Sequence, residues 1–381
     1  MIDKNKNICI MPWIAIDRNR NNDTGKTSLT PCCIYEPKTQ STNTETYWNS
    51  DEIISLRQQM LDGKRPDGCR ICWKNEDNGN ESLRQSINDS RLKPYQDRLK
   101  KTKLDVAPVQ IKYTVGIECN LACRMCLPNL SSQVKKVWNI LGKEYDGELD
   151  NILNDADYIL KNRKNIHYLD IQGGEPFYHK KAKNLLKKLI ETKDNEHITL
   201  YITTNATRID PETVNLLKQF KDVVLGISID GVGKIQEYIR PGCNWEILSN
   251  NIKTLKENNI SLQVVSTISV LTILNLHELE QWCNDNDIHF AHPGLVEIPH
   301  ELAPHNLPYQ LHNFVPEKYK KLVTSKPITH DCTNFIRELD KYWGTDITKI
   351  IPEWKIVFEN LHWSNFEYLK KIDKELENYV E

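Results

Sequence analysis

Three cysteines stand close together near the middle of the chain, in the segment ECNLACRMCLPN. They are Cys119, Cys123 and Cys126, separated by three residues and then by two. A structural zinc ion or an iron–sulfur cluster normally takes four protein ligands. Either a fourth ligand comes from elsewhere in the chain, or one coordination position is left open for another molecule.

The overall composition narrows the class of protein. The chain has 381 residues, with 50 basic and 52 acidic side chains and a formal net charge of −2, so no overall field attracts nucleic acid or anionic lipid. No apolar run approaches the roughly 18 residues of a membrane helix, and the segment MIDKNKNICI lacks the apolar region of a signal peptide. We therefore expect a cytoplasmic protein that binds neither nucleic acid nor membranes, with its oligomeric state left open.

Eleven cysteines are many for a reducing compartment, where disulfides are rare and clustered thiols indicate metal or catalytic ligands. Three form the central motif, and three more stand alone, namely Cys243, Cys283 and Cys332. The remaining five lie near the N-terminus: Cys9, Cys32, Cys33, Cys69 and Cys72.

Residues 108–300 alternate between short β-branched segments and helix-length amphipathic segments. This alternation predicts an α/β fold with six parallel strands covered by helices. The expected helices include 180–192, 211–220 and 245–259, the second with Asp210 as its N-cap. The expected strands are 110–117, 166–172, 198–204, 223–229, 262–270 and 288–294.

Unusual loops follow the first four predicted strands. The cysteine motif follows the first strand, GGEP (173–176) follows the second, and TTNAT (203–207) follows the third. The segment SIDG (228–231) ends the fourth strand. Function concentrates at the carboxyl ends of parallel strands, whether the sheet is open and doubly wound or a partial barrel. The sequence therefore predicts one site on this rim.

The cysteine spacing and these loops together resemble the radical S-adenosylmethionine (SAM) superfamily. The resemblance implies a partial (β/α)6 barrel with a 4Fe–4S cluster on Cys119, Cys123 and Cys126. In that superfamily the fourth iron chelates SAM, which the reduced cluster cleaves to a 5′-deoxyadenosyl radical. That radical abstracts a hydrogen atom from the substrate.

The same resemblance implies which residues hold SAM. Gly173, Gly174, Glu175 and Pro176 match the segment that binds the SAM amino group, and the glycines would let the backbone approach a ligand closely. The further implied contacts are Thr204 and Asn205, then Ser228 and Arg240 for ribose and carboxylate, and Met125 beside the adenine. Thr204 and Asn205 would equally suit a plain polar turn, and Met125 would equally suit the hydrophobic core. Asp230 fits a residue that caps the next turn.

The N-terminal cysteines resemble the SPASM domain or the shorter twitch domain, which bind auxiliary iron–sulfur clusters in this superfamily. Five cysteines supply one four-ligand cluster with a thiol to spare, which favours the twitch-like form. The family domain usually follows the barrel, whereas this one precedes it. Four thiolates would also form a zinc site. The expected ligands are Cys9, Cys32, Cys69 and Cys72, with Cys33 as substitute for Cys32, and the further landmarks are the Gly25 turn, Trp48 and Arg57.

We expect four segments along the chain. They are a cysteine-rich iron–sulfur domain of irregular structure (1–95), a charged linker (96–107), the barrel (108–300), and a loop with C-terminal helices (301–381). The aromatic-rich segment 353–380 would cover the open side of the barrel or pack an apolar helix stripe.

Two groups of potentially reactive or metal-binding side chains lie outside these motifs, namely the single cysteines and the later histidines. Cys243 lies near the rim and is a candidate hydrogen-atom donor to a substrate radical, although a buried inert thiol is the commoner case. Cys283 and Cys332 fit structural positions. The spacing of the later histidines fits no metal motif: His289, His292, His300, His305 and His312.

The expected function is a radical SAM enzyme that modifies a peptide or protein, with oxidation or rearrangement of a small molecule as the alternative. The implied partner is an electron donor such as flavodoxin or ferredoxin. A different class, a non-catalytic zinc-stabilised α/β binding protein, has no use for an incomplete cysteine set followed by GGEP.

Overall fold

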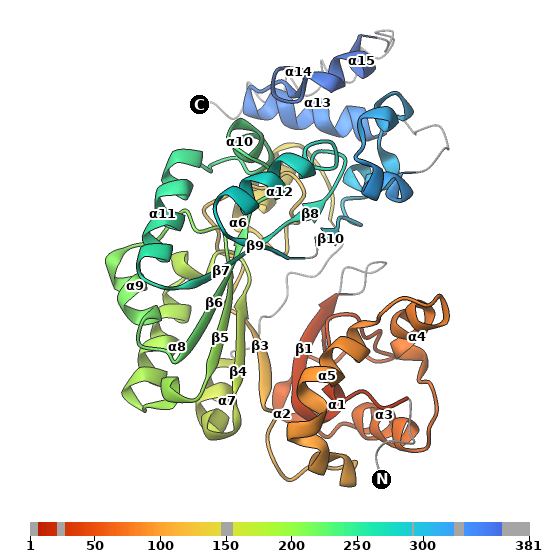
Figure 1. Ribbon diagram of the computed structural model, residues 1–381, viewed down its shortest axis with the longest axis vertical. Coiled ribbons are helices and arrows are strands. Elements are labelled where there is room, and N and C mark those ends of the chain that lie inside the picture. Colours follow the sequence, from red (N-terminus) through yellow and green to blue (C-terminus); the bar gives the residue numbers. More distant parts are fainter. Residues whose placement is uncertain (1–6, 21–26, 146–154, 292, 324–330, 360–381) are drawn as a thin grey trace.

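The computed structural model describes residues 7–20, 27–145, 155–291, 293–323 and 331–359, and its main feature is an eight-stranded sheet with helices on its outer side (Figure 1). Three features named above lie outside the described residues: the Gly25 turn, His292, and the predicted C-terminal helix beyond residue 359.

The strand order in the sheet is β2-β1-β3-β4-β5-β6-β7-β9, and neighbouring strands are parallel except β1 and β2. β8 and β10 form a small separate parallel pair. The α/β class and the parallel sheet of a partial barrel are confirmed. The strands are β1 (Ala15–Arg20), β2 (Thr27–Thr30), β3 (Gln110–Thr114), β4 (Tyr168–Gln172), β5 (Thr199–Thr204), β6 (Asp222–Ser228), β7 (Ser261–Val265), β8 (Thr267–Ile268), β9 (His289–Phe290) and β10 (Gly294–Leu295).

Alternate side chains of each strand face opposite sides of the sheet. On β3 and β4, Ile111 and Ile171 are buried in the core under the helices. Thr114 and Gln172 belong to the opposite, inner side and line a large cavity. The period-2 pattern therefore separates an apolar layer that holds the fold from a polar layer that faces the site.

The last two predicted strands are shorter than expected. The segment 262–270 divides into β7 and β8, and 288–294 is reduced to β9 with β10 just beyond. The division falls at Ser266 because the Thr267 N–H donates to the Asp230 carboxylate at 2.8 Å and the Ser266 hydroxyl donates to it at 3.2 Å. These bonds turn the chain away from the main sheet.

The predicted helices 180–192, 211–220 and 245–259 are confirmed as α8, α9 and α11. Asp210 caps α9 by accepting from Thr213 N at 2.7 Å. The helices are α1 (Met11–Ile14), α2 (Thr44–Tyr47), α3 (Asp51–Leu61), α4 (Arg70–Asp77), α5 (Leu83–Tyr95), α6 (Ser132–Ile140), α7 (Asp155–Asn162), α8 (Lys180–Glu191), α9 (Pro211–Leu217), α10 (Lys234–Ile239), α11 (Trp245–Glu257), α12 (Leu276–Asp285), α13 (Asp331–Trp343), α14 (Ile347–Ile350) and α15 (Lys355–Phe358).

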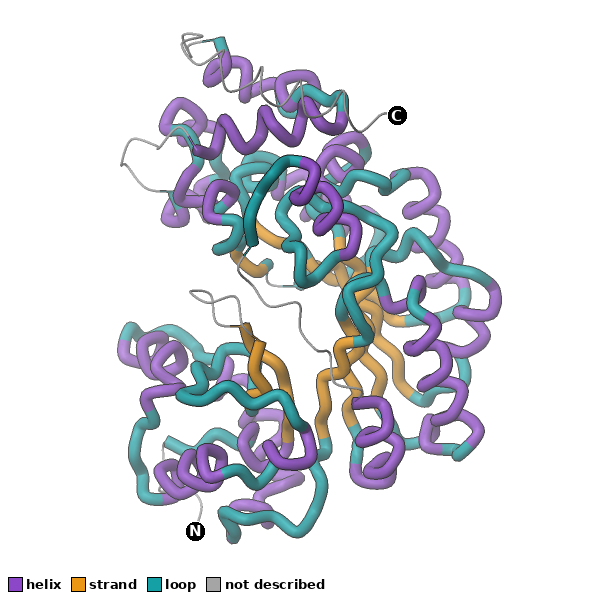
Figure 2. Tube along the Cα trace, turned by 180° about the vertical axis from the view of Figure 1, so that it is seen from behind, coloured by secondary structure: helices purple, strands orange, loops and turns teal. Residues whose placement is uncertain are grey.

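The described residues up to 95, here called the N-terminal unit, contain β1, β2 and α1–α5. Strand β1 pairs in parallel with β3, with Ala15 opposite Gln110 and Ile16 opposite Ile111. Figures 1 and 2 show this unit beside the β3 edge, with the C-terminal helices at the far end of the molecule. The cysteine-rich segment, expected to be irregular, therefore also extends the barrel sheet.

Residues 96–107 pack against the N-terminal unit. Leu99 and Leu104 are buried. Trp13 Nε1 donates to Lys101 O at 2.8 Å, and Arg57 Nη1 donates to Thr102 O at 2.7 Å. The predicted linker is thus held by backbone carbonyls along its length, while the domain boundaries themselves stay a prediction.

The C-terminal helices α13–α15 pack on α6 and α10, which belong to the barrel. Trp354 is fully buried there, in a core with Trp138 and Phe335. Within the described residues, these helices lie on the end of the barrel that carries the loops after the strands (Figure 1).

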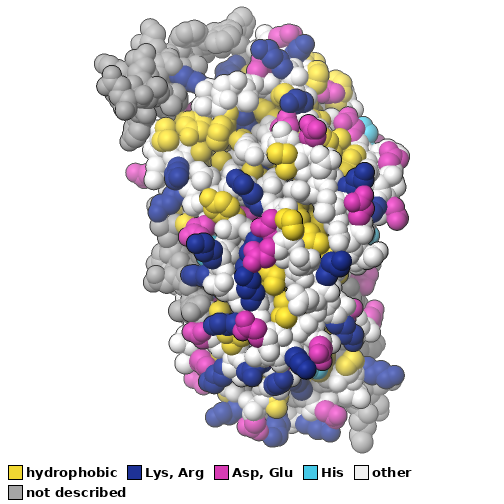
Figure 3. Space-filling model, turned by 90° about the vertical axis from the view of Figure 1, so that its left-hand side faces the viewer, with side chains coloured by type: hydrophobic (Ala, Val, Ile, Leu, Met, Phe, Trp, Pro, Cys, Tyr) yellow, Lys and Arg dark blue, Asp and Glu magenta, His cyan; other side chains and the backbone are white. Residues whose placement is uncertain are grey.

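Basic and acidic side chains are interspersed on the face covered by α8, α9 and α11 (Figure 3). This mixture agrees with the net charge of −2. In the part of the chain that the structure describes, none of the helices is both long and apolar enough to cross a membrane.

Candidate functional site

A cavity of about 650 Å³ lies at the carboxyl ends of the parallel strands, a volume in the usual range for small-molecule sites. The N-terminal unit contributes Arg18 and Thr27 to its wall, which sequence reasoning did not anticipate. The predicted residues that line it are Cys119, Cys123, Cys126, Met125, Gly173, Gly174, Thr204, Asn205, Ser228 and Arg240.

The cysteine loop connects β3 to α6 and is fixed from two sides. Ala122 N donates to Pro241 O at 3.0 Å, and Arg124 N donates to Ile239 O at 2.9 Å. The Arg124 side chain donates to Tyr238 O at 2.7 Å and pairs with Asp340 of α13 at 3.0 Å. The loop is therefore braced by both the α10 region and the C-terminal helices.

The three thiols fit the ligand set of an iron–sulfur cluster. All are free and line the same cavity. Burial raises the pKa of Cys119 to about 11 and that of Cys126 to about 12, so these thiols need a metal to ionise. Arg240 Nη1 lies 3.6 Å from Cys123 Sγ, where it would offset the negative charge of bound thiolates.

The two glycines of GGEP allow a close approach between loops, while their expected approach to a ligand stays a prediction. A Cβ on Gly174 would lie 2.2 Å from Glu118 O, and one on Gly173 would lie 2.6 Å from the Thr114 methyl group. Both glycines also have positive φ, of 99° at Gly173 and 47° at Gly174. They let the β4 loop pack directly on the cysteine loop, where Glu175 N donates to Glu118 O at 2.9 Å.

Glu175 is fully buried, and its carboxylate joins the β4 and β5 loops. It accepts from Thr204 Oγ1 at 2.6 Å, Asn205 N at 2.7 Å and Phe177 N at 3.1 Å. Burial raises the pKa of this carboxyl, although the three hydrogen-bond donors act to lower it. Pro176 is buried and begins a short 3-10 helix. Contacts of Glu175 and Pro176 with SAM stay predictions, since neither of these two residues lines the cavity.

Asp230 holds Arg240, a role that a turn-capping residue would not have. The Arg240 Nε and Nη2 atoms donate to Asp230 at 2.7 and 2.6 Å, and Asp230 is fully buried. The signal in the sequence was an acidic residue shortly after the fourth strand, followed by an arginine at the end of the next helix.

Cys243 is buried behind Arg240 and does not line the cavity. Its N–H donates to Arg240 O at 2.9 Å, and burial raises the pKa of its thiol to about 12. The hydrogen-donor role stays a prediction without support from this placement.

A row of charged side chains crosses the inner side of the sheet, one step along the strands from the cavity lining. Lys112 Nζ lies 2.8 Å from Asp17 Oδ1 on β1 and 3.8 Å from Asp170 Oδ2 on β4. A second ion pair joins Arg18 to Asp155 at the start of α7. These pairs fasten the N-terminal unit to the barrel.

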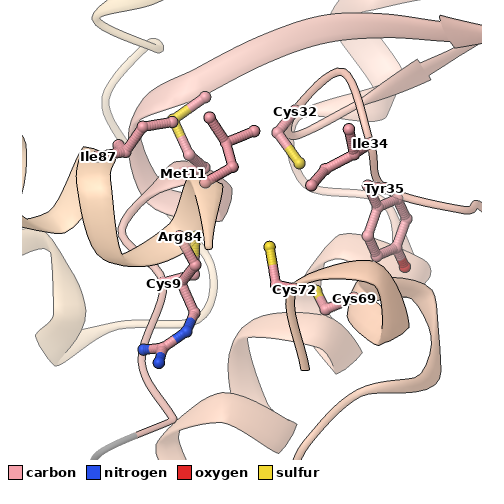
Figure 4. Close-up of a pocket in the computed structure, with 10 residues that line it drawn as sticks. Cys9, Met11, Cys32, Ile34, Tyr35, Cys69, Cys72, Arg84 and Ile87 are labelled. Atoms are coloured by element: carbon pink, nitrogen blue, oxygen red, sulfur yellow. The ribbon is translucent and has the colours of Figure 1, made fainter. Parts of the chain in front are cut away.

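Four cysteines of the N-terminal unit surround one small pocket (Figure 4). They are Cys9, Cys32, Cys69 and Cys72. Cys33 is exposed and does not belong to the lining, so the placement favours Cys32 over Cys33 as a ligand. All four lining thiols are free.

Among the described residues, no three His, Cys, Asp or Glu side chains lie together in a way that suits a single metal ion.

Residues 113–285 match the family model described as "Radical SAM superfamily". This segment is similar to radical SAM domains, and the three thiols on the cavity wall lie within it. The matched residues contain the cysteine motif, the GGEP loop and the Asp230–Arg240 pair.

Curated relatives of this chain include mycofactocin maturase MftC from Mycobacterium tuberculosis, 24% identical over 182 residues. The protein of that name from Mycolicibacterium smegmatis is 24% identical over 177 residues. The alignments cover 46% of this chain and 41% of each relative, so the chain matches less than half the length of these proteins.

Two solved structures have a limited overall likeness to this chain. "Native anSMEcpe with bound AdoMet and Cp18Cys peptide" has a TM-score of 0.40 and 19% identity, covering 62% of this chain and 60% of that one. Streptococcus suis SuiB bound to the precursor peptide SuiA has a TM-score of 0.39 and 15% identity, covering 88% and 75%.

Proposed function

We propose that this protein is a radical SAM enzyme that modifies a peptide or protein, with a second iron–sulfur cluster in its N-terminal unit. The cluster on Cys119, Cys123 and Cys126, when bound and reduced, supplies the electron that cleaves SAM. The observation that carries the proposal is the meeting of three free thiols, the GGEP loop and Arg240 on one cavity, within a segment similar to radical SAM domains.

The cavity lining offers SAM separate polar and apolar surfaces. Thr204, Asn205 and Ser228 stand at strand ends and would bind ribose and carboxylate oxygens. Arg240, held by Asp230, places its remaining guanidinium nitrogen beside Cys123, where it would bind the carboxylate of SAM and offset the charge of the thiolates. Apolar neighbours of the cysteines, including Met125, exclude water from the reacting end.

We favour a cluster over a zinc ion in the N-terminal pocket. Its four thiols line one pocket, and residues 113–285 of the same chain match the radical SAM superfamily. Because four protein ligands would complete such a cluster, the site favours electron transfer over direct binding of substrate.

A peptide or protein substrate is supported by the relatives that are named maturases, and a small molecule is the alternative. We also propose a flavodoxin or ferredoxin as the electron donor. The cytoplasmic location proposed for the protein agrees with eleven cysteines that all lie in the described residues and form no disulfide. The zinc-stabilised binding protein loses its support, because residues 113–285 match an enzyme family.

The test uses the full chain, reconstituted with iron and sulfide under anaerobic conditions. About eight irons per chain and 5′-deoxyadenosine formed from SAM and dithionite are expected. The variant with Cys119, Cys123 and Cys126 all replaced by alanine should keep about four irons and form no 5′-deoxyadenosine. Cleavage of SAM by this variant would refute the assignment.

A further inference from the structure

The N-terminal thiol pocket has an apolar surface, and Arg84 lines it while its guanidinium points outward to Ile8 O and Glu76. Besides the four cysteines, its lining consists of apolar side chains, Tyr35 and Arg84 (Figure 4). Arg84 is the one charged side chain among the described residues that line this pocket. A cluster held by four thiolates carries net negative charge, and reduction adds one negative charge more.

Several contacts fix Arg84 beside the thiols. Its Nε and Nη2 atoms donate to Glu76 at 2.9 and 2.6 Å, and its Nη1 atom donates to Ile8 O at 2.7 Å, next to Cys9. Its guanidinium lies 4.9 Å from the Trp73 ring centroid. The side chain is 9% exposed, so water screens its charge weakly.

Arg84 lies in the first turn of α5, next to Leu83, which also lines the pocket. Its guanidinium charge favours the ionised forms of Cys9, Cys69 and Cys72. Glu76, the ion-pair partner of Arg84, has the opposite effect, because its negative charge disfavours the ionised forms of Cys9 and Cys72. The pocket therefore has a fixed cation and a fixed anion close to the same thiols.

We propose that Arg84 is a positioning residue that raises the reduction potential of the auxiliary cluster, with Glu76 acting in the opposite direction. This inference rests on the proposed cluster in the N-terminal unit. Hydrogen bonds to cluster sulfurs and nearby positive charge stabilise the reduced, more negative state. In the acceptor role, a substrate radical would lose one electron to this cluster and one proton to a base.

The test measures the potential directly, in the full chain with Cys119, Cys123 and Cys126 replaced by alanine, so that one cluster remains. Redox titration followed by electron paramagnetic resonance gives the potential of that cluster. Arg84→Gln should lower it and Glu76→Gln should raise it, each by about tenfold in the ratio of reduced to oxidised cluster, or about 59 mV for one electron. The double variant should lie near the parent.

These opposite shifts separate charge from structure. Both substitutions break the same ion pair, so a purely structural role would move the potential in one direction for both variants. Arg65→Gln is the matched control, because Arg65 lies over the same Trp73 ring at 5.4 Å yet pairs with Asp77 away from the pocket lining. It should leave the potential unchanged.

The outcomes separate a failure of the role proposed for Arg84 from a failure of the proposed auxiliary cluster. About four irons in the parent with unshifted or equally shifted potentials would overturn the role of Arg84 and keep the cluster. Zinc in place of iron would overturn the auxiliary cluster and this inference together. Should Arg84→Gln fail to bind iron, Glu76→Gln and the double variant still decide, because a potential that does not rise in Glu76→Gln refutes the charge effect.

Discussion

Asp230 holds Arg240 through two donors at 2.7 and 2.6 Å, while the third guanidinium nitrogen lies 3.6 Å from Cys123 Sγ. This chain of contacts connects the end of β6 to Cys123, one of the predicted cluster ligands. Because Asp230 is fully buried, its charge is matched by Arg240 rather than by water. The orientation of Arg240 in the cavity wall therefore depends on a residue that does not itself line the cavity.

Asp230→Asn should release Arg240 and leave a buried guanidinium without its ion partner. Removal of one member of a buried pair destabilises a protein by about 3 kcal/mol. We also expect 5′-deoxyadenosine formation to fall roughly tenfold, which corresponds to about 1.4 kcal/mol of transition-state stabilisation. Glu257→Gln, in the exposed pair with Lys253, is the control and should change neither quantity. Unchanged cleavage with full iron content would show that Arg240 does not need Asp230.

Gly174→Ala should disturb the packing of the GGEP loop on the cysteine loop. The new Cβ would lie 2.2 Å from Glu118 O, a contact that forces the backbone apart. Gly142→Ala is a matched control, since Gly142 also has positive φ but a Cβ added to it would have none of the described atoms within 4 Å. Both variants should lose about 1 kcal/mol from the strained φ, and Gly174→Ala should lose more and bind less iron. Equal urea midpoints would contradict the role assigned to this contact.

Asp170 should make the stability of the protein depend on pH. Burial raises the pKa of its carboxyl from 3.8 to about 6, with Lys112 opposing the shift. The folded protein therefore carries an ionisation penalty that is complete above about pH 6 and absent below about pH 4. Asp170→Asn should raise the free energy of unfolding at pH 7.5 by about 1–3 kcal/mol, and this gain should vanish as the pH falls toward 4.

Urea unfolding at several pH values checks this expectation. Asp105→Asn is the control, because Lys101 holds the pKa of the exposed Asp105 carboxyl below its usual value, so that variant should gain no stability. A gain at Asp170 that stays constant from pH 4 to pH 7.5 would mean that packing, not ionisation, is responsible.

The rim of the barrel could be predicted from sequence because each part of it is local. The cysteine spacing, the GGEP loop and the strand-end polar residues follow directly after β-branched segments, and the parallel sheet brings strand ends to one edge. The structure places Cys126, Gly174 and Ser228 on one cavity, as that reasoning requires.

The contribution of the N-terminal unit could not be predicted in this way. Strand β1 reads AIDRNR, without period-2 apolar alternation, because Asp17 and Arg18 are buried by ion pairs with Lys112 and Asp155 rather than by apolar contacts. Its pairing with β3 joins segments far apart in the chain. Arg84 was missed for the same reason, since its place beside the thiols depends on how α4 and α5 pack.

Cys32 and Cys33 offer a direct comparison of two neighbouring thiols. The Cys32 side chain lines the pocket with Cys9, Cys69 and Cys72, whereas Cys33 is exposed outside it. The chain bends and turns at residues 31–34, and this turn directs one thiol of the pair into the pocket. Cys32→Ala should therefore reduce iron from about eight to about four per chain, while Cys33→Ala should keep about eight. Iron and sulfide analysis of the two reconstituted variants decides, and 5′-deoxyadenosine formation should persist in both because the barrel thiols are untouched. Equal loss of iron in the two variants would mean that the ligand is not fixed by this geometry.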